Sequence, residues 1–155
     1  MIRRLDEKDL PLLADVMVSW LKNTDVVFPI DRGGTIAYLT TVLKDPSYAI
    51  FGAFDNDLYP EEPEHIVGWI LGQITSYTFL CRKVVSELAW YVDPQFRGAG
   101  KDLMTELLRW GQSQGAEYAI SCILLSAGKD KGERAIKAIE GLGFQEFEKT
   151  FYMKI

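Results

Sequence analysis

Residues 93–101 read Asp-Pro-Gln-Phe-Arg-Gly-Ala-Gly-Lys, and this stretch decides the fold expected for the rest of the chain. Residues 86–92 before it form an extended run, and residues 103–114 after it have the spacing of an amphipathic helix. Glycines let the backbone approach a ligand closely, and the start of a helix offers unpaired N–H groups. A strand, a glycine loop with two cations and a helix start therefore predict a phosphate-binding loop.

An ordinary strand-to-helix turn with surface cations is the alternative interpretation of this loop. Two other phosphate-binding motifs are excluded by single residues. A P-loop needs glycine at position 95 and Ser or Thr at position 102, where the chain has Gln95 and Asp102. A dinucleotide-binding fingerprint needs a third glycine at position 103, which is Leu103.

Composition predicts one globular domain over residues 1–155, because 48% hydrophobic residues can build a full core. The net charge of −5 argues against a nucleic-acid partner and is compatible with a cationic substrate. No apolar run approaches the roughly 20 residues that span a membrane. The N-terminus is charged rather than apolar, so we expect no signal peptide, no membrane partner and a cytoplasmic location.

The two cysteines, Cys81 and Cys122, cannot make a disulfide framework. No cluster of residues has metal-ligand spacing, so no metal is expected. Residues 118–125 are almost continuously apolar, which predicts a central strand covered on both faces. Cys122 falls inside this run and is interpreted as a packing residue.

The remaining pattern predicts alternating strands and helices. A short strand over residues 2–5 is expected before a helix that begins near Pro11 and ends at Asn23, and a second helix runs from Thr35 to just before Asp45. Strands are then predicted over residues 48–54, 66–77 with bulges at Gly68 and Gly72, and 84–92, a final helix over 133–142, and closing strands at 147 and 151–155. This order predicts an α/β (α+β) fold with a mixed sheet and helices on both faces.

Two segments resemble the GNAT superfamily of N-acetyltransferases. Residues 90–101 are similar to its acetyl-CoA segment, a strand ending in Val-x-Pro followed by Arg-Gly-x-Gly. Residues 132–144 are similar to its last helix and Leu-Gly-Phe turn. The resemblance covers essentially the whole chain in element order, and the Glu-Leu-x-Trp-Tyr-Val wording also resembles small phage-carried members. It implies a mostly antiparallel central sheet with a V-shaped split.

The resemblance also implies the cosubstrate and its contacts. Acetyl-CoA would lie with its pantetheine arm paired to the backbone of Val92, where the strands from Glu87 and Tyr118 splay apart. An amine would attack the thioester directly, with no covalent enzyme intermediate. The pyrophosphate would be held by the backbone amides of Arg97, Gly98, Ala99, Gly100 and Lys101.

Three residues depart from the family pattern. Asp102 stands where the last loop residue is usually Gly or Ala, and Gly132 stands where an asparagine is common. Ile139 takes the place of a tyrosine that often protonates the leaving thiolate, and isoleucine has no proton to donate. Either another acid or water serves, or the chain is a degenerate, inactive member that acts as a binding module.

Glu87 is the candidate catalytic base. Strand alternation predicts Glu87, Ala89 and Tyr91 on one face of the sheet. A carboxylate among Trp, Leu and Val should have a raised pKa, which suits a base working near neutral pH. The alternative is a strand-edge glutamate paired with Arg82 or Lys83.

The leading hypothesis is therefore an acetyl-CoA-dependent N-acetyltransferase that acts on a small-molecule or peptide amine. Its substrate groove is expected between the loop around Phe28 and the linker over residues 77–81. The final strand could pair between two copies, which would make a homodimer.

Overall fold

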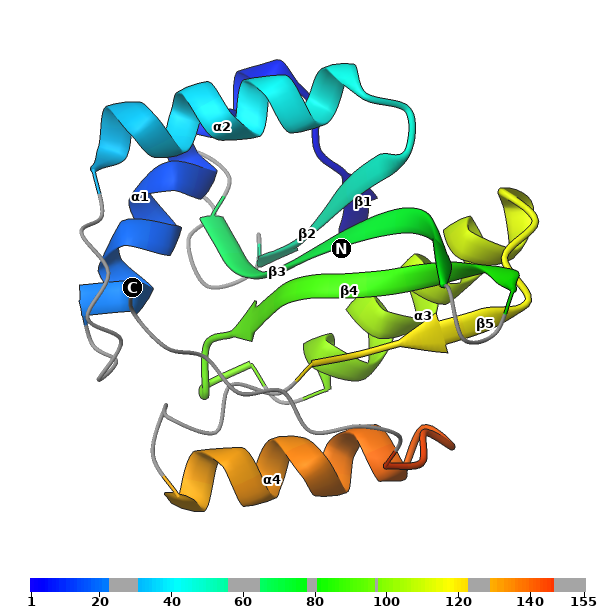
Figure 1. The fold of residues 1–155 in the computed structure, drawn as a ribbon. Coiled ribbons are helices and arrows are strands. Elements are labelled where there is room, and N and C mark those ends of the chain that lie inside the picture. Colours follow the sequence, from blue (N-terminus) through cyan, green and yellow to red (C-terminus); the bar gives the residue numbers. More distant parts are fainter. Residues whose placement is uncertain (23–30, 56–64, 78–80, 97, 123–128, 147–155) are drawn as a thin grey trace, which may run out of the picture.

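The computed structural model describes residues 1–22, 31–55, 65–77, 81–96, 98–122 and 129–146 (Figure 1). The predicted closing strands, the loop around Phe28 and most of the linker over residues 77–81 lie outside the described residues. None of the described helices is long and apolar enough to cross a membrane. The elements follow in the order β1 (Ile2–Arg4), η1 (Glu7–Asp9), α1 (Leu10–Lys22), α2 (Arg32–Lys44), β2 (Tyr48–Asp55), β3 (His65–Tyr77), β4 (Arg82–Val92), α3 (Ala99–Ser113), β5 (Tyr118–Ile120) and α4 (Lys129–Glu140).

The described strands form one sheet in the order β1-β2-β3-β4-β5. Neighbouring strands are antiparallel from β1 to β4, and β5 joins β4 in parallel. The prediction of a mixed, mostly antiparallel sheet is thus confirmed. The parallel neighbour requires a crossover, and α3 supplies it.

Helices cover both faces of this sheet, as predicted (Figure 1). On one face, α1 and α2 bury Leu13 and Leu39 against Ile50 and Trp69 of the sheet. On the other face, α3 buries a stripe of side chains that includes Leu103 and Leu107 against the same strands. Each fully buried side chain of this size contributes about 1.5–3 kcal/mol, so the two layers hold β4 firmly between them.

The sheet is irregular at the two glycines where bulges were expected. The β2–β3 register shifts so that Val67, beside Gly68, is the extra residue. The β3–β4 register shifts beside Gly72, and here the extra residue is Leu88 of β4. A bulge reverses the alternation of side chains along its strand, so the two ends of β4 present their odd-numbered residues to opposite faces.

Three helices begin earlier than predicted, and one of them is α4, which starts at Lys129 rather than residue 133. α2 starts at Arg32 rather than Thr35, because the Asp31 side chain accepts hydrogen bonds from the N–H groups of Gly33 and Gly34 at 3.2 and 2.6 Å. The glycine pair therefore belongs to the first helical turn. α3 starts at Ala99 rather than residue 103, immediately after the turn at Gly98.

Glycines close α3 and α4, near the ends predicted for these helices at residues 114 and 142. After α3, the Ala116 N–H donates to the Gly111 carbonyl at 2.9 Å. After α4, the Phe144 N–H donates to the Ile139 carbonyl at 3.3 Å, and Gly143 has a φ of +94°. Both patterns are those of a helix closed by a left-handed residue.

Candidate active site

The parallel strands β4 and β5 separate after a short paired stretch. Val84, Val85 and Ser86 pair with Tyr118, Ala119 and Ile120, and the pairing then ends. Among the described residues, the rest of β4 is paired only with β3. The expected split between the strands is therefore present among the described residues. Of the predicted central strand over residues 118–125, Tyr118–Ile120 pair with β4, Ser121 and Cys122 do not, and residues 123–125 lie outside the described residues.

The backbone of Val92 points into the open side of this split. The Asp93 N–H donates to the Val67 carbonyl at 2.9 Å, so these two residues form a hydrogen-bonded pair. Hydrogen-bonded and non-hydrogen-bonded pairs alternate along an antiparallel ladder. Val92, which faces Gly68, is therefore of the second kind, and its N–H and C=O point away from β3. An extended ligand lying in the split could pair with them.

The N-terminus of α3 follows directly and has no side-chain cap. Its N-cap is Gly98, with φ +100° and ψ −34°, a backbone conformation that side chains oppose. Ala99 and Gly100 are the first helical residues, so their N–H groups have no acceptor within the helix. The Lys101 N–H already donates to the Gly98 carbonyl at 3.1 Å. The group of Lys101 that could donate to a ligand is therefore its side-chain ammonium, and this residue is exposed. Arg97 lies outside the described residues.

Gly100 lets the helix start lie close to β4. A Cβ at this position would lie 2.9 Å from Cζ2 of Trp90, so any larger residue would push the indole or the loop away. The loop and the strand that precedes it are thus packed together through Trp90, and Val92 and the α3 N-terminus are held at the same end of the sheet.

Glu87 lies at the point where the strands part. Its side chain is buried, with 4% exposed, and Oε2 accepts hydrogen bonds from Ser121 Oγ at 2.7 Å and from the Cys122 N–H at 3.2 Å. Burial raises the pKa of this carboxyl, and the two hydrogen bonds partly oppose that rise. The predicted direction of the pKa shift is confirmed.

The alternative, a strand-edge glutamate paired with a cation, is wrong. Arg82 pairs with Glu117 at 3.6 Å. Lys83 Nζ donates to the Gln114 carbonyl at 2.9 Å. Neither cation reaches Glu87, which lies deeper in the sheet.

The predicted face of Glu87 is also wrong. The register pairs Glu87 with Gly72 and Ala89 with Leu71, two β3 neighbours that point to opposite faces. Ala89 and Tyr91 pack on the α1–α2 side, whereas a Cβ on Gly72 would meet Leu107 of α3. The bulge at Leu88 therefore places Glu87 on the α3 side of the sheet.

Sequence reasoning missed Ser121 altogether. The residue interrupts an apolar run, and that interruption was the available signal. Cys122, interpreted from the sequence as a buried strand residue, is instead exposed and lies beyond the end of β5. It contributes its backbone N–H to Glu87 rather than its side chain to the core.

Neither Ile139 nor Tyr91 supplies a proton to the leaving thiolate in this arrangement. Ile139 is buried in α4 with 7% exposed and carries no polar side-chain atom. Tyr91 packs against Trp20 with ring centroids 5.6 Å apart, and burial, with Asp93 nearby, raises the pKa of its phenol. Tyr91 is therefore a packing residue on the face opposite Glu87.

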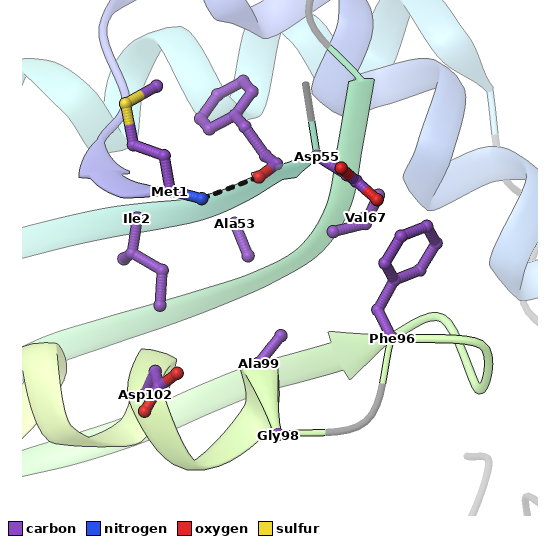
Figure 2. Close-up of a pocket in the computed structure, with 10 residues that line it drawn as sticks. Met1, Ile2, Ala53, Asp55, Val67, Phe96, Gly98, Ala99 and Asp102 are labelled. Atoms are coloured by element: carbon purple, nitrogen blue, oxygen red, sulfur yellow. Dashed lines mark hydrogen bonds between the residues drawn. The ribbon is translucent and has the colours of Figure 1, made fainter. Parts of the chain in front are cut away.

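A hollow of about 300 Å³ borders the N-terminus of α3 (Figure 2). Gly98, Ala99 and Asp102 line it from the helix start, and Ile2 and Ala53 line it from β1 and β2. The Asp102 carboxylate therefore lines the same hollow as the uncapped end of the helix.

Comparison with known proteins places these features in context. The model of the acetyltransferase (GNAT) family matches residues 15–144, which is most of the chain. A search of curated proteins found no match.

Solved structures share the fold over the whole chain. A probable acetyltransferase is 17% identical, with a TM-score of 0.77 over 100% of this chain and 97% of the other. The aminoglycoside N-acetyltransferase AAC(6′)-Iy in complex with CoA is 20% identical, with a TM-score of 0.75 over 100% and 93%. An aminoglycoside acetyltransferase from an uncultured soil sample is 18% identical, with a TM-score of 0.71 over 100% and 95%. At these identities the likeness concerns the fold alone.

Proposed function

Because the chain belongs to the GNAT acetyltransferase family, we propose that it transfers an acetyl group from acetyl-CoA directly to a primary amine, with Glu87 as the base. Acetyl-CoA is the acetyl donor of this family, so the cosubstrate expected from the sequence is confirmed at that level. One arrangement carries the proposal. The buried Glu87 and the open backbone of Val92 both belong to the second half of β4, and the uncapped start of α3 follows the end of that strand.

The α3 N-terminus supplies the anion site. Its free N–H groups at Ala99 and Gly100 and its helix dipole favour a pyrophosphate. The ammonium group of Lys101 adds an exposed positive charge. The pantetheine arm runs from there along β4 and pairs with the outward N–H and C=O of Val92, in the manner of an added strand. This places the thioester toward Glu87.

Glu87 supplies the base for the chemical step. Its carboxylate takes a proton from the incoming amine, the amine nitrogen attacks the thioester carbon, and the carbon–sulfur bond breaks to release the CoA thiolate. A proton from water or from the attacking nitrogen neutralises that thiolate, because Ile139 cannot. Leu88 is the residue that the β3–β4 register skips, and we assign its main-chain N–H to polarise the thioester carbonyl.

The pH dependence follows from the burial of Glu87. A base works only when it is deprotonated, and the pKa of Glu87 is raised above its ordinary value of 4.5. Activity should therefore rise with pH through that raised pKa. Folding stability has the opposite sign: burial of the charged form costs free energy, so this residue favours folding less as pH rises past its unfolded pKa.

The amine is the least defined part of the proposal. Two similar structures are named as aminoglycoside acetyltransferases, and the net charge of −5 suits a cationic substrate. An aminoglycoside, a polyamine, a lysine side chain and a peptide N-terminus are the four amines to compare.

Calorimetry with acetyl-CoA, followed by a thiol-release assay on these amines, tests the proposal. We expect saturable binding and release of CoA with at least one amine class. Glu87→Gln should lower kcat roughly 100-fold or more and leave the affinity for acetyl-CoA nearly unchanged. Glu117→Gln makes the same change at an exposed residue and should leave both kcat and the affinity for acetyl-CoA unchanged.

Three negative results would each exclude a different part of the proposal. Absence of acetyl-CoA binding would remove the cofactor site and leave the binding-module reading. Binding without release of CoA on any amine would remove the transferase reading. Full activity in Glu87→Gln would leave the transferase reading intact and remove Glu87 from it.

A further inference from the structure

We propose that Ser121 is a positioning residue, which holds the Glu87 carboxylate at the strand split with one oxygen left to take the amine proton. The inference rests on the proposed function, because it assigns a role within the same site. Ser121 does not itself touch the reacting atoms in this scheme. It acts through Glu87, to which its hydroxyl donates at 2.7 Å.

The position of Ser121 follows from the register of the parallel strands. The last backbone pair is Ser86 with Ile120, so Glu87 and Ser121 would form the next pair if the ladder continued. Instead their side chains make the contact, and the backbone of Cys122 turns its N–H to the same carboxylate at 3.2 Å. Two side chains and one amide thus close the sheet where the main-chain pairing stops.

Both hydrogen bonds reach the same oxygen. Oε2 accepts from Ser121 and from Cys122, while Oε1 accepts none from the described residues. A carboxylate that is fastened by one oxygen keeps the lone pairs of the other for a proton. Fixing the side chain in this way also spares the reaction the cost of ordering it.

Among the described residues, the two hydrogen-bond donors are the main groups that stabilise the charged form of Glu87. Gly72 faces it from β3, and Leu107 of α3 lies next to that glycine. Ser86 and Leu88 flank it along β4 itself. No charged group of the described residues contributes to the pKa of Glu87, which burial raises and the two hydrogen bonds lower.

Removing the hydroxyl should have two separable effects. The carboxylate would lose a donor that favours its charged form, so its pKa would rise further. The base would then be protonated over a wider range, and the acid limb of the rate profile would move to higher pH. The side chain would also be freer to rotate, which lowers kcat even where Glu87 is ionised.

The pH profile of kcat/KM in Ser121→Ala and Ser121→Thr tests the assignment. Ser121→Ala should lose about tenfold in activity at the acid end of the profile, with the limb displaced to higher pH and acetyl-CoA affinity unchanged. Ser121→Thr keeps the hydroxyl and should restore both the rate and the limb. Ser113→Ala removes a serine hydroxyl that bonds the Trp110 carbonyl in α3 and should leave the profile unaltered.

A direct titration separates this inference from the proposed function. Carbon-13 NMR of glutamate-labelled protein, with the Glu87 signal assigned by its loss in Glu87→Gln, reports the ionisation without turnover. Its midpoint should lie higher in Ser121→Ala than in the parent and in Ser121→Thr. An unshifted midpoint together with an unshifted profile would overturn the role of Ser121. If the parent acetylates no amine, the proposed function falls, and the midpoint alone still decides whether Ser121 sets the ionisation of Glu87.

Discussion

The starts of α2 and α3 have similar sequences and opposite chemistry. Each has two glycines among its N-cap and first residues, in Asp-Arg-Gly-Gly at α2 and in Gly-Ala-Gly at α3. At α2 the Asp31 carboxylate accepts from the N–H groups of Gly33 and Gly34. At α3 the N-cap is Gly98, which has no side chain to offer.

On the proposed function, this difference separates a helix start that caps itself from one that binds an anion. A capped N-terminus has its donors satisfied and gains stability from its own side chain. An uncapped N-terminus keeps its donors and its positive dipole end for an external anion. On the proposed function, a glycine-rich helix start therefore binds an anion only where no side chain caps it.

The largest effect is expected from disturbing the uncapped start. Gly98→Ala places a side chain at φ +100° with no atom within 4 Å, so backbone strain is its only direct effect. It should cost about 1–2 kcal/mol of stability and weaken acetyl-CoA binding about tenfold through a displaced helix start. Chemical denaturation and calorimetry measure the two quantities.

Gly143→Ala is the matched control, because Gly143 has φ +94° and is equally open. It should lose similar stability, since the strain is the same, and keep its affinity, since it closes α4 instead. Equal losses of affinity in both variants would mean that the α3 start is not the anion site.

Removing the cap of α2 should give the second effect. Asp31→Ala leaves the Gly33 and Gly34 N–H groups without their acceptor and should cost about 1 kcal/mol, as measured by urea denaturation. Asp31→Asn keeps an acceptor and should retain most of that stability. Neither change should alter acetyl-CoA affinity, and a drop in affinity would mean that the α2 start also belongs to the site.

A smaller effect is expected from the cation beside the open start. Lys101→Met should weaken acetyl-CoA binding about threefold, because an exposed charge contributes little in water, and it should reduce the dependence of affinity on salt. Lys44→Met, an exposed lysine at the far end of α2, is the control. If the affinity for acetyl-CoA, measured by calorimetry, falls with salt concentration equally steeply in the parent and in Lys101→Met, the ammonium group does not face the ligand.

The smallest effect concerns Asp102 in the first turn of α3. Its carboxylate is exposed and lines a hollow together with Gly98 and Ala99, so solvent and salt reduce its repulsion of a phosphate (Figure 2). Asp102→Asn should tighten acetyl-CoA binding about twofold and lower stability by a few tenths of a kcal/mol through the helix dipole. Weaker binding in this variant would show that the carboxylate supports the site.

The sequence predicted the fold through its local patterns. Apolar residues at helical spacing located α1 and α2, β-forming runs located β2, β3 and β4, and glycines located the ends of α3 and α4. Helix starts were less certain, because a cap residue such as Asp31 looks like any loop aspartate until its side chain turns back on the helix. The order of elements predicted a mixed sheet with helices on both faces, and the resemblance to the GNAT superfamily implied the split.

The site was only partly predictable for a related reason. Glu87 could be singled out because it lies on the strand that leads to the glycine loop. Its face could not, because a bulge depends on how β4 is paired with β3 and leaves no mark in the sequence of β4. Ser121 lies 34 residues further along the chain and meets Glu87 only through the parallel pairing with β5.

The bulge at Leu88 changes the face of the sheet on which the odd-numbered side chains of β4 lie. Before Leu88 these side chains face the α3 layer, and after it they face the layer of α1 and α2. Deleting Leu88 would leave Glu87 and Ala89 opposite their present β3 partners, Gly72 and Leu71, in regular alternation. Both layers should therefore tolerate the loss of this residue, and only the local irregularity of β4 would disappear.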